Sequence, residues 1–188
     1  MPIKMIFIGT SLGGLKALGQ LFSQLPDNFS IPIAVVIHRS SIEFDYLVES
    51  LQKHTSLTVH EALDKQPIKH STVTIAPADY HLLVEDAHFA LSTDFAIEHA
   101  RPSIDVLMES GADNYGEQAL GIILTGGGHD GVQGLKAIKD RGGRVLVQSP
   151  SSCEDSTLPQ AVIQAGIAIK GYSIKELAHE MVTSVSVN

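Results

Sequence analysis

Short, continuously apolar runs alternate with helix-like segments along most of this chain, and this alternation constrains its fold more than any other feature. The apolar runs predict strands over residues 5–8, 31–37, 73–76, 120–124 and 144–148. Helix-spaced apolar residues predict helices over 15–25, 42–51, 135–140 and 174–182, and a further helix that Arg101-Pro-Ser opens. Strands that are apolar on both faces are typical of a parallel sheet covered by helices on both sides. We therefore predict a doubly wound, mostly parallel α/β sheet.

One short hairpin is predicted beside this pattern. Residues 81–84 and 88–91 flank Glu85-Asp86-Ala87 as two strand-like runs, and we expect His81 and His88 at the surface. The chain has 188 residues, enough to bury a full core, and it contains no internal repeat or linker. We expect a single domain over residues 1–188.

The composition excludes several classes of function. The net charge of −8 argues against a nucleic-acid partner, because non-specific binding needs a basic face. No apolar stretch approaches the roughly 20 residues that span a bilayer, so we expect no membrane insertion. The early first strand leaves no room for a signal peptide, and the single cysteine, Cys153, fits a reducing compartment, so we expect a cytoplasmic location. The nine histidines show no metal-ligand spacing, and we expect neither a metal nor another cofactor.

Three polar residues follow apolar strands. Ser11 comes after the first strand, His38 closes the second, and Asp130 lies in the loop GGGHDG after the strand at 120–124. Ligands of open parallel sheets bind beyond the carboxyl ends of the strands. Serine, histidine and aspartate are the three parts that activate an alcohol nucleophile: the histidine takes the serine proton, and the carboxylate stabilises the imidazolium.

Each of the three also has a structural interpretation. Ser11 can cap the following helix, a histidine at a strand end is more often a surface or hydrogen-bonded residue, and Asp130 can be stabilised by a helix start. Ser11 satisfies G-x-S-x-G, yet its place on the first strand and the order Ser, His, Asp do not fit an α/β-hydrolase. The glycines that crowd two of the loops favour a site over three separate structural roles.

Several longer motifs carry a resemblance. They are Gly9-Thr-Ser-Leu-Gly-Gly14, the strand-ending His38, Ile75-Ala-Pro-Ala-Asp-Tyr-His81, Arg101-Pro-Ser-Ile-Asp-Val-Leu107, Leu124-Thr-Gly-Gly-Gly-His-Asp-Gly131, and residues 148–159 with their Ser-Ser-Cys centre. In this order they resemble the catalytic domain of chemotaxis receptor methylesterases, the CheB family, over about residues 5 to 166.

The resemblance implies a serine-type protein-glutamate methylesterase. Its substrate would be glutamate γ-methyl esters of methyl-accepting chemotaxis receptors or a related signalling protein, and some members also deamidate glutamines. Ser11 would attack the ester, His38 would shuttle the proton, and Asp130 would orient the imidazole. Backbone amides near Leu12 and Gly127 would form the oxyanion hole.

Departures from the family pattern concern the substrate and the regulation. The family's His-Met-Pro is replaced by His38-Arg39-Ser40, and the cation of Arg39 can favour an acidic substrate or lower the affinity of the histidine for a proton. The family's G-M-G loop reads Gly126-Gly127-Gly128. We expect no receiver domain before the first strand, so the phosphorylation switch would be absent or supplied by a response regulator in trans.

Four further residues are candidates for the site or for structural roles near it. Arg101 can clamp a carboxylate or form a surface ion pair, and His129 can act as a lid or substrate contact. Asp105 is expected to be a first-turn helix acid and Cys153 a packing residue. Two alternative functions stay open: a catalytically weak homologue that binds a receptor or signalling partner, and a small-molecule serine esterase.

Overall fold

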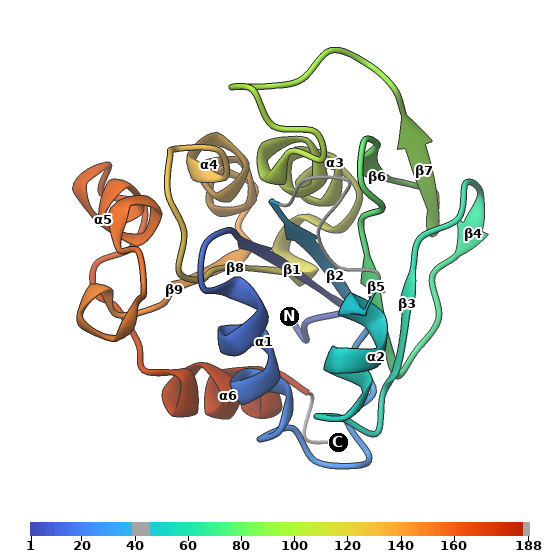
Figure 1. The fold of residues 1–188 in the computed structure, drawn as a ribbon, viewed down its shortest axis with the longest axis horizontal. Helices are drawn as coiled ribbons and strands as arrows, with labels where there is room; N and C mark the ends of the chain where they lie inside the picture. The colour runs from blue at the N-terminus through green and yellow to red at the C-terminus, as the bar shows by residue number, and fades with distance from the viewer. Residues whose placement is uncertain (39–45, 186–188) are drawn as a thin grey trace.

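The computed structural model describes residues 1–38 and 46–185, and its centre is a sheet of parallel strands (Figure 1). The strand order is β3-β5-β2-β1-β8-β9, and every pairing between neighbours is parallel. The strands are β1 (Met5–Thr10), β2 (Ile33–Ile37), β3 (Thr58–Glu61), β5 (Thr72–Ile75), β8 (Ala119–Ile123) and β9 (Arg144–Val147). The predicted parallel α/β fold is confirmed.

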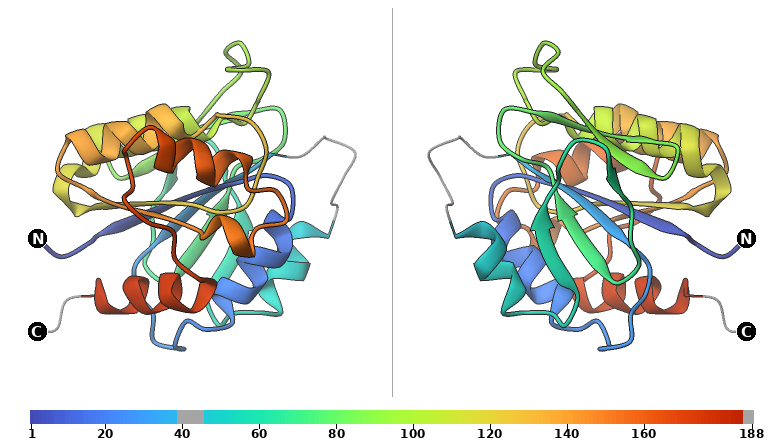
Figure 2. Two further views of the ribbon diagram at one scale, coloured as in Figure 1. Left: turned by 90° about the vertical axis from the view of Figure 1, so that its left-hand side faces the viewer. Right: turned by 90° about the vertical axis from the view of Figure 1, so that its right-hand side faces the viewer.

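Helices cover both faces of this sheet (Figures 1 and 2). On one face lie α1 (Gly14–Phe22), α2 (Leu47–Gln52) and α6 (Ile174–Thr183), and on the other α3 (Ile104–Tyr115), α4 (Val132–Asp140) and α5 (Thr157–Gln164). Of the helix predicted over 42–51, the structure shows α2, and residues 39–45 lie outside the described part. None of the helices in the described ranges is long and apolar enough to span a bilayer.

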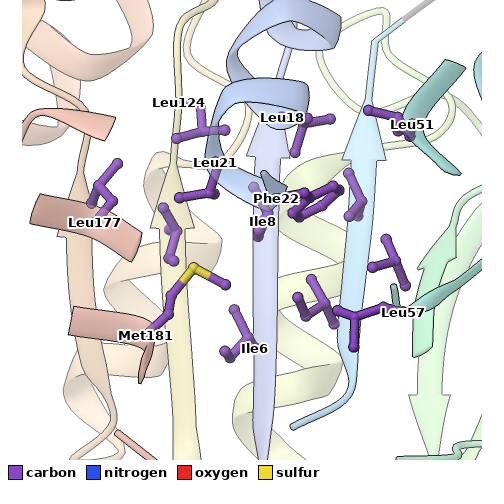
Figure 3. Packing of buried hydrophobic residues seen from close by; sticks show 14 of the residues in the cluster. Ile6, Ile8, Leu18, Leu21, Phe22, Leu51, Leu57, Leu124, Leu177 and Met181 are labelled. Carbon is purple, nitrogen blue, oxygen red and sulfur yellow. The ribbon is translucent and has the colours of Figure 1, made fainter. Parts of the chain in front are cut away.

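The strand β1 shows why both faces need a cover. All six of its residues are buried, and the side chains of residues 5–8 alternate between the two hydrophobic clusters. Ile6 and Ile8 pack with α1 and α6 (Figure 3), whereas Met5 and Phe7 pack on the side of α3 and α4. Full burial of one such side chain stabilises the fold by roughly 2 kcal/mol. A continuous apolar run is therefore what a central parallel strand requires.

A small antiparallel sheet lies beside α3. Its order is β4-β7-β6, from β4 (Gln66–Pro67), β6 (His81–Glu85) and β7 (His88–Ser92). The predicted hairpin is confirmed as β6 and β7. The strands β3 and β4 and the helix α5 were not predicted: in β3 only Val59 is buried, and Pro159 lies within α5.

The chain reverses its winding direction at β1. From β1 it passes through α1 to β2 on one side, and it returns through α3, on the opposite face, to β8 on the other side. Such a switch point opens a crevice beyond the carboxyl ends of the central strands. Ser11, His38 and the loop 124–131 follow these three strands directly.

Candidate active site

Ser11 is held by its backbone and not by its side chain. Its N–H donates to the Thr125 carbonyl at 3.1 Å, and its own carbonyl accepts from the Gly14 N–H at 2.9 Å. The N-cap of α1 is Gly13, with φ +79° and no side-chain cap, so the capping role considered for Ser11 is wrong. Within the described residues the Ser11 hydroxyl forms no hydrogen bond, which leaves it available to a ligand.

The loop after β8 approaches Ser11 so closely that only glycine fits. A Cβ on Gly126 would lie 2.8 Å from the Ser11 Cβ and 3.0 Å from its backbone nitrogen. Real Cβ atoms do not approach other atoms so closely, so this contact fixes the loop against the serine. Gly126 is thus required by packing next to the candidate nucleophile.

His38 lies beside Ser11 and binds Asp130. Its backbone N–H donates to the Thr10 carbonyl at 3.0 Å, which places it next to the end of β1. Its Nε2 lies 2.7 Å from the Asp130 Oδ2. Because the carboxylate accepts, Nε2 carries the proton, and Nδ1 is the ring nitrogen left to act on a serine. The sequence placed these residues at one sheet edge, and the structure brings His38 and Asp130 into contact.

Asp130 is buried and surrounded by donors at the start of α3. Its carboxylate accepts from the Ser103 hydroxyl at 2.7 Å, the Ile104 N–H at 2.7 Å and the Asp105 N–H at 3.0 Å. Burial opposes the charge, but the hydrogen bonds from His38, Asp105, Ser103 and Ile104 outweigh it and hold the pKa of Asp130 below its ordinary value. A carboxylate whose ionised form is favoured is suited to stabilising an imidazolium. The helix start that stabilises Asp130 is that of α3, not the following α4 as considered from the sequence.

Asp105 supports α4 from the first turn of α3. Its Oδ1 accepts from the N–H groups of Gly131 at 2.8 Å and Gly134 at 2.7 Å. Burial raises the pKa of Asp105 to about 6; the bond from Gly134 acts against this rise, and the nearby Asp130 adds to it. The expectation of a first-turn acid is confirmed, although the helix it caps is a different one.

Two backbone amides are available to an oxyanion. The N–H groups of Leu12 and Gly127 donate to no other described residue. The loops that carry them are joined by Thr125, whose hydroxyl donates to the Leu12 carbonyl at 2.9 Å and accepts from the Asp155 N–H at 3.0 Å. That both amides donate to one substrate oxygen stays a prediction.

A cavity of about 740 Å³ opens at these residues. Ser11 and His38 line it at one side, and it extends along α1 and α2 past Lys16, Gln20 and His54. Lys16, His38 and His54 are the ionisable side chains among its described lining residues, which include no carboxylate. In a chain of net charge −8, this cavity is a local exception that suits an acidic ligand.

Arg101 and His129, two other candidate residues, lie outside the cavity. Arg101 donates to the carbonyls of Thr93 and Asp94 at 3.1 and 3.3 Å; it forms no ion pair within the described residues and does not line the cavity. His129 is exposed outside the cavity. Arg39 lies outside the described residues.

Two smaller expectations have opposite outcomes. His81 is only 2% exposed and hydrogen-bonded at both ring nitrogens, so its predicted surface position is wrong, whereas His88 is exposed as predicted.

Cys153 donates to the Ser149 carbonyl, and burial raises the pKa of its thiol to about 11, which agrees with a packing role. No group of three His, Cys, Asp or Glu side chains in the described ranges is arranged to hold a metal.

The fold and the site together define a class: a doubly wound α/β protein with a serine, a histidine and a buried carboxylate beyond its central parallel strands. The model of the CheB methylesterase family matches residues 6–181. The chain therefore belongs to the CheB methylesterase family, a family of hydrolases.

Individual relatives agree with this assignment. A relative from Leptospira interrogans is 37% identical over 179 residues, which cover 95% of this chain and 93% of that protein. The protein-glutamate methylesterase/protein-glutamine glutaminase of Trichodesmium erythraeum is 35% identical over 98% of this chain, which spans 54% of that protein. The crystal structure of the Thermotoga maritima CheB methylesterase catalytic domain matches with a TM-score of 0.91 at 31% identity, over 97% of this chain and 98% of that one.

Proposed function

We propose that this chain hydrolyses glutamate γ-methyl esters of methyl-accepting chemotaxis receptors, or of a related signalling protein, through Ser11, His38 and Asp130. The observation that carries the proposal is the 2.7 Å contact between His38 Nε2 and Asp130 Oδ2, beside a cavity that Ser11 also lines. A carboxylate-bound histidine next to a serine is the arrangement that activates a hydroxyl nucleophile. The relatives named protein-glutamate methylesterase indicate the class of ester.

The first half of the reaction forms an ester on Ser11. Its Oγ attacks the ester carbonyl carbon while His38 Nδ1 takes the hydroxyl proton, because Nε2 is bound to Asp130. The amides of Leu12 and Gly127 stabilise the oxyanion of the tetrahedral intermediate. The bond between the carbonyl carbon and the methoxy oxygen then breaks, and the leaving oxygen takes the proton from His38 and departs as methanol.

The second half restores the enzyme. Water attacks the acyl group on Ser11, His38 accepts the water proton, and the bond to Oγ breaks as that proton passes to the serine. The products are the glutamate carboxylate and free Ser11. A glutamine side chain can form the same acyl-enzyme with ammonia as the leaving group, and the names of several relatives pair the two activities.

The charge of the cavity favours an acidic substrate segment. Lys16 lies along the cavity beyond Ser11, where its ammonium group would face carboxylates that neighbour the esterified glutamate. Arg39, which follows His38, would add to this preference. We further propose that the protein is cytoplasmic and that residues 1–188 form one catalytic domain. We also propose that a response regulator acts in trans as its regulatory partner.

Methanol release tests the proposal. The purified chain is expected to release methanol from a methylated receptor, and Ser11→Ala is expected to bind that receptor as well as the parent while releasing none. A parent that binds the receptor without releasing methanol would favour the binding-module alternative. Turnover of small esters alone would favour the small-molecule esterase.

A further inference from the structure

The start of α3 is organised around Asp130. Its first four N–H groups all have acceptors: Ser103 donates to His81 Nδ1 at 3.2 Å, Ile104 and Asp105 donate to Asp130 at 2.7 and 3.0 Å, and Val106 donates to Ser103 Oγ at 3.4 Å. The first N–H groups of a helix have no partner within the helix, so side chains must satisfy them. Here the acceptors include Asp130 and a second histidine, His81, which the reaction itself does not use.

The two oxygens of Asp130 are held symmetrically. Oδ1 accepts from the Ser103 hydroxyl and the Asp105 N–H, and Oδ2 accepts from the Ile104 N–H and His38 Nε2. Ser103 is fully buried and supplies the shortest contact to Oδ1, at 2.7 Å. Loss of its hydroxyl would leave Oδ1 with one longer bond, and the carboxylate would be freer to turn away from His38.

His81 holds Ser103 through a defined tautomer. Its Nε2 lies 3.0 Å from the Phe95 carbonyl oxygen, which can only accept, so Nε2 carries the proton. Nδ1 is then a lone-pair acceptor for the Ser103 N–H. Phe95 belongs to the exposed segment 93–99, which projects from the body of the molecule (Figure 2). The carbonyl of this segment thus selects the tautomer that Ser103 needs.

We propose that Ser103 and His81 are positioning residues of the reaction: His81 fixes the backbone of Ser103, and the Ser103 hydroxyl holds Asp130 in line with His38. The inference rests on the proposed function, because it concerns the geometry of the same three residues. Neither Ser103 nor His81 touches the substrate, so their removal should slow turnover and leave binding unchanged.

The first test removes the hydroxyl of Ser103. In Ser103→Ala and Ser103→Gly we expect kcat to fall about tenfold with KM unchanged, since a hydrogen bond to a charged group is lost. Both variants are needed because alanine also removes the N-cap of α3, whereas glycine is tolerated at N-caps nearly as well as serine. Ser173→Ala is the matched control: Ser173 caps α6 with a comparable bond, and α6 lies on the opposite face. It should keep the parental kcat.

The second test separates the two ring nitrogens of His81. In His81→Asn the amide oxygen replaces Nδ1 as the acceptor for Ser103, and in His81→Gln the amide nitrogen replaces Nε2 as the donor to Phe95. We expect kcat to stay near the parental value in His81→Asn and to fall in His81→Gln. Equal losses of kcat in the two variants would contradict the role given to Nδ1.

A spectroscopic readout makes the inference independent of turnover. The His38 Nε2 proton shared with Asp130 should give a downfield proton resonance that persists in His81→Asn and Ser173→Ala. In Ser103→Ala and His81→Gln it should broaden or move upfield. A parental resonance and a parental kcat in Ser103→Ala, Ser103→Gly and His81→Gln would overturn the inference and leave the proposed function intact. If the parent releases no methanol, the proposed function fails, and the resonance alone decides the positioning role.

Discussion

Asp130 and Asp105 exchange helix caps: each carboxylate accepts hydrogen bonds from the start of the helix beside the other residue. Asp130 precedes α4 yet accepts from the first N–H groups of α3, while Asp105, in the first turn of α3, accepts from Gly131 and Gly134 of α4. The exchange fixes α3 and α4 side by side and places two carboxylates close together. Only one of them, Asp130, has its charge favoured by the surroundings.

The other carboxylate makes stability depend on pH. Folding raises the pKa of Asp105 from 3.8 to about 6, so the native state holds this proton more tightly than the unfolded state. Stability is therefore lost as the pH rises through this window. Asp105→Asn keeps an oxygen for both glycine N–H groups. Relative to this variant, the free energy of unfolding of the parent should fall by on the order of 2 kcal/mol between about pH 4 and pH 7. Urea unfolding at the two pH values measures the difference, and a difference independent of pH would contradict the account.

Gly126 should be essential because it has no side chain. In Gly126→Ala the new methyl group would push Ser11 out of place, and a displacement of about 1 Å can cost roughly 100-fold in rate. Gly128→Asn is the control in the same loop, since a Cβ there meets nothing within 4 Å and asparagine tolerates its φ of +80°. Methanol release should collapse in the first variant and persist in the second. Equal activities would show that the loop does not position the serine.

Lys16 should contribute to the recognition of acidic substrates. Lys16→Glu reverses a charge in the lining of the cavity, and we expect KM for a methylated acidic receptor segment to rise roughly threefold to tenfold. Because Lys16 is exposed, added salt should shrink the effect. Lys4→Glu makes the same change in net charge at the amino end of β1 and serves as the control. Matching KM values in the two variants would argue against charge recognition in the cavity.

Cys153 should be chemically inert in the native state. With its pKa raised by burial from 9.0 to about 11, the thiol should react about 100-fold more slowly with a thiol reagent at mildly alkaline pH than it does in urea. The chain has one cysteine, so the labelling kinetics report this site alone. Cys153→Ala should release methanol at the parental rate. Rapid native labelling together with loss of activity would point to a nucleophilic role instead.

Much of the fold could be predicted because the central strands are apolar on both faces. Once a parallel sheet is predicted, residues that follow its strands must share one edge, and this places Ser11, His38 and Asp130 together. The edge strand β3 was not predicted, because it buries only Val59 and has no continuous apolar run.

The supporting residues of the site depend on contacts between distant segments. Ser103 could be expected as an N-cap from Arg101-Pro-Ser, but its bond to Asp130 spans 27 positions, and that of His81 to Ser103 spans 22. No local pattern shows that α3 and α4 lie side by side or that a hairpin histidine turns inward. The sequence motifs mark these residues, and only the packing shows what each one touches.

Labelling with a fluorophosphonate reports directly whether Ser11 is an activated nucleophile, because such a reagent phosphonylates a serine beside a general base far faster than an ordinary serine. We expect one adduct per chain, located on Ser11 by peptide mapping, and its loss in His38→Ala and in Asp130→Asn. An adduct on another residue, or methanol release that continues without reaction at Ser11, would contradict the nucleophilic role of Ser11.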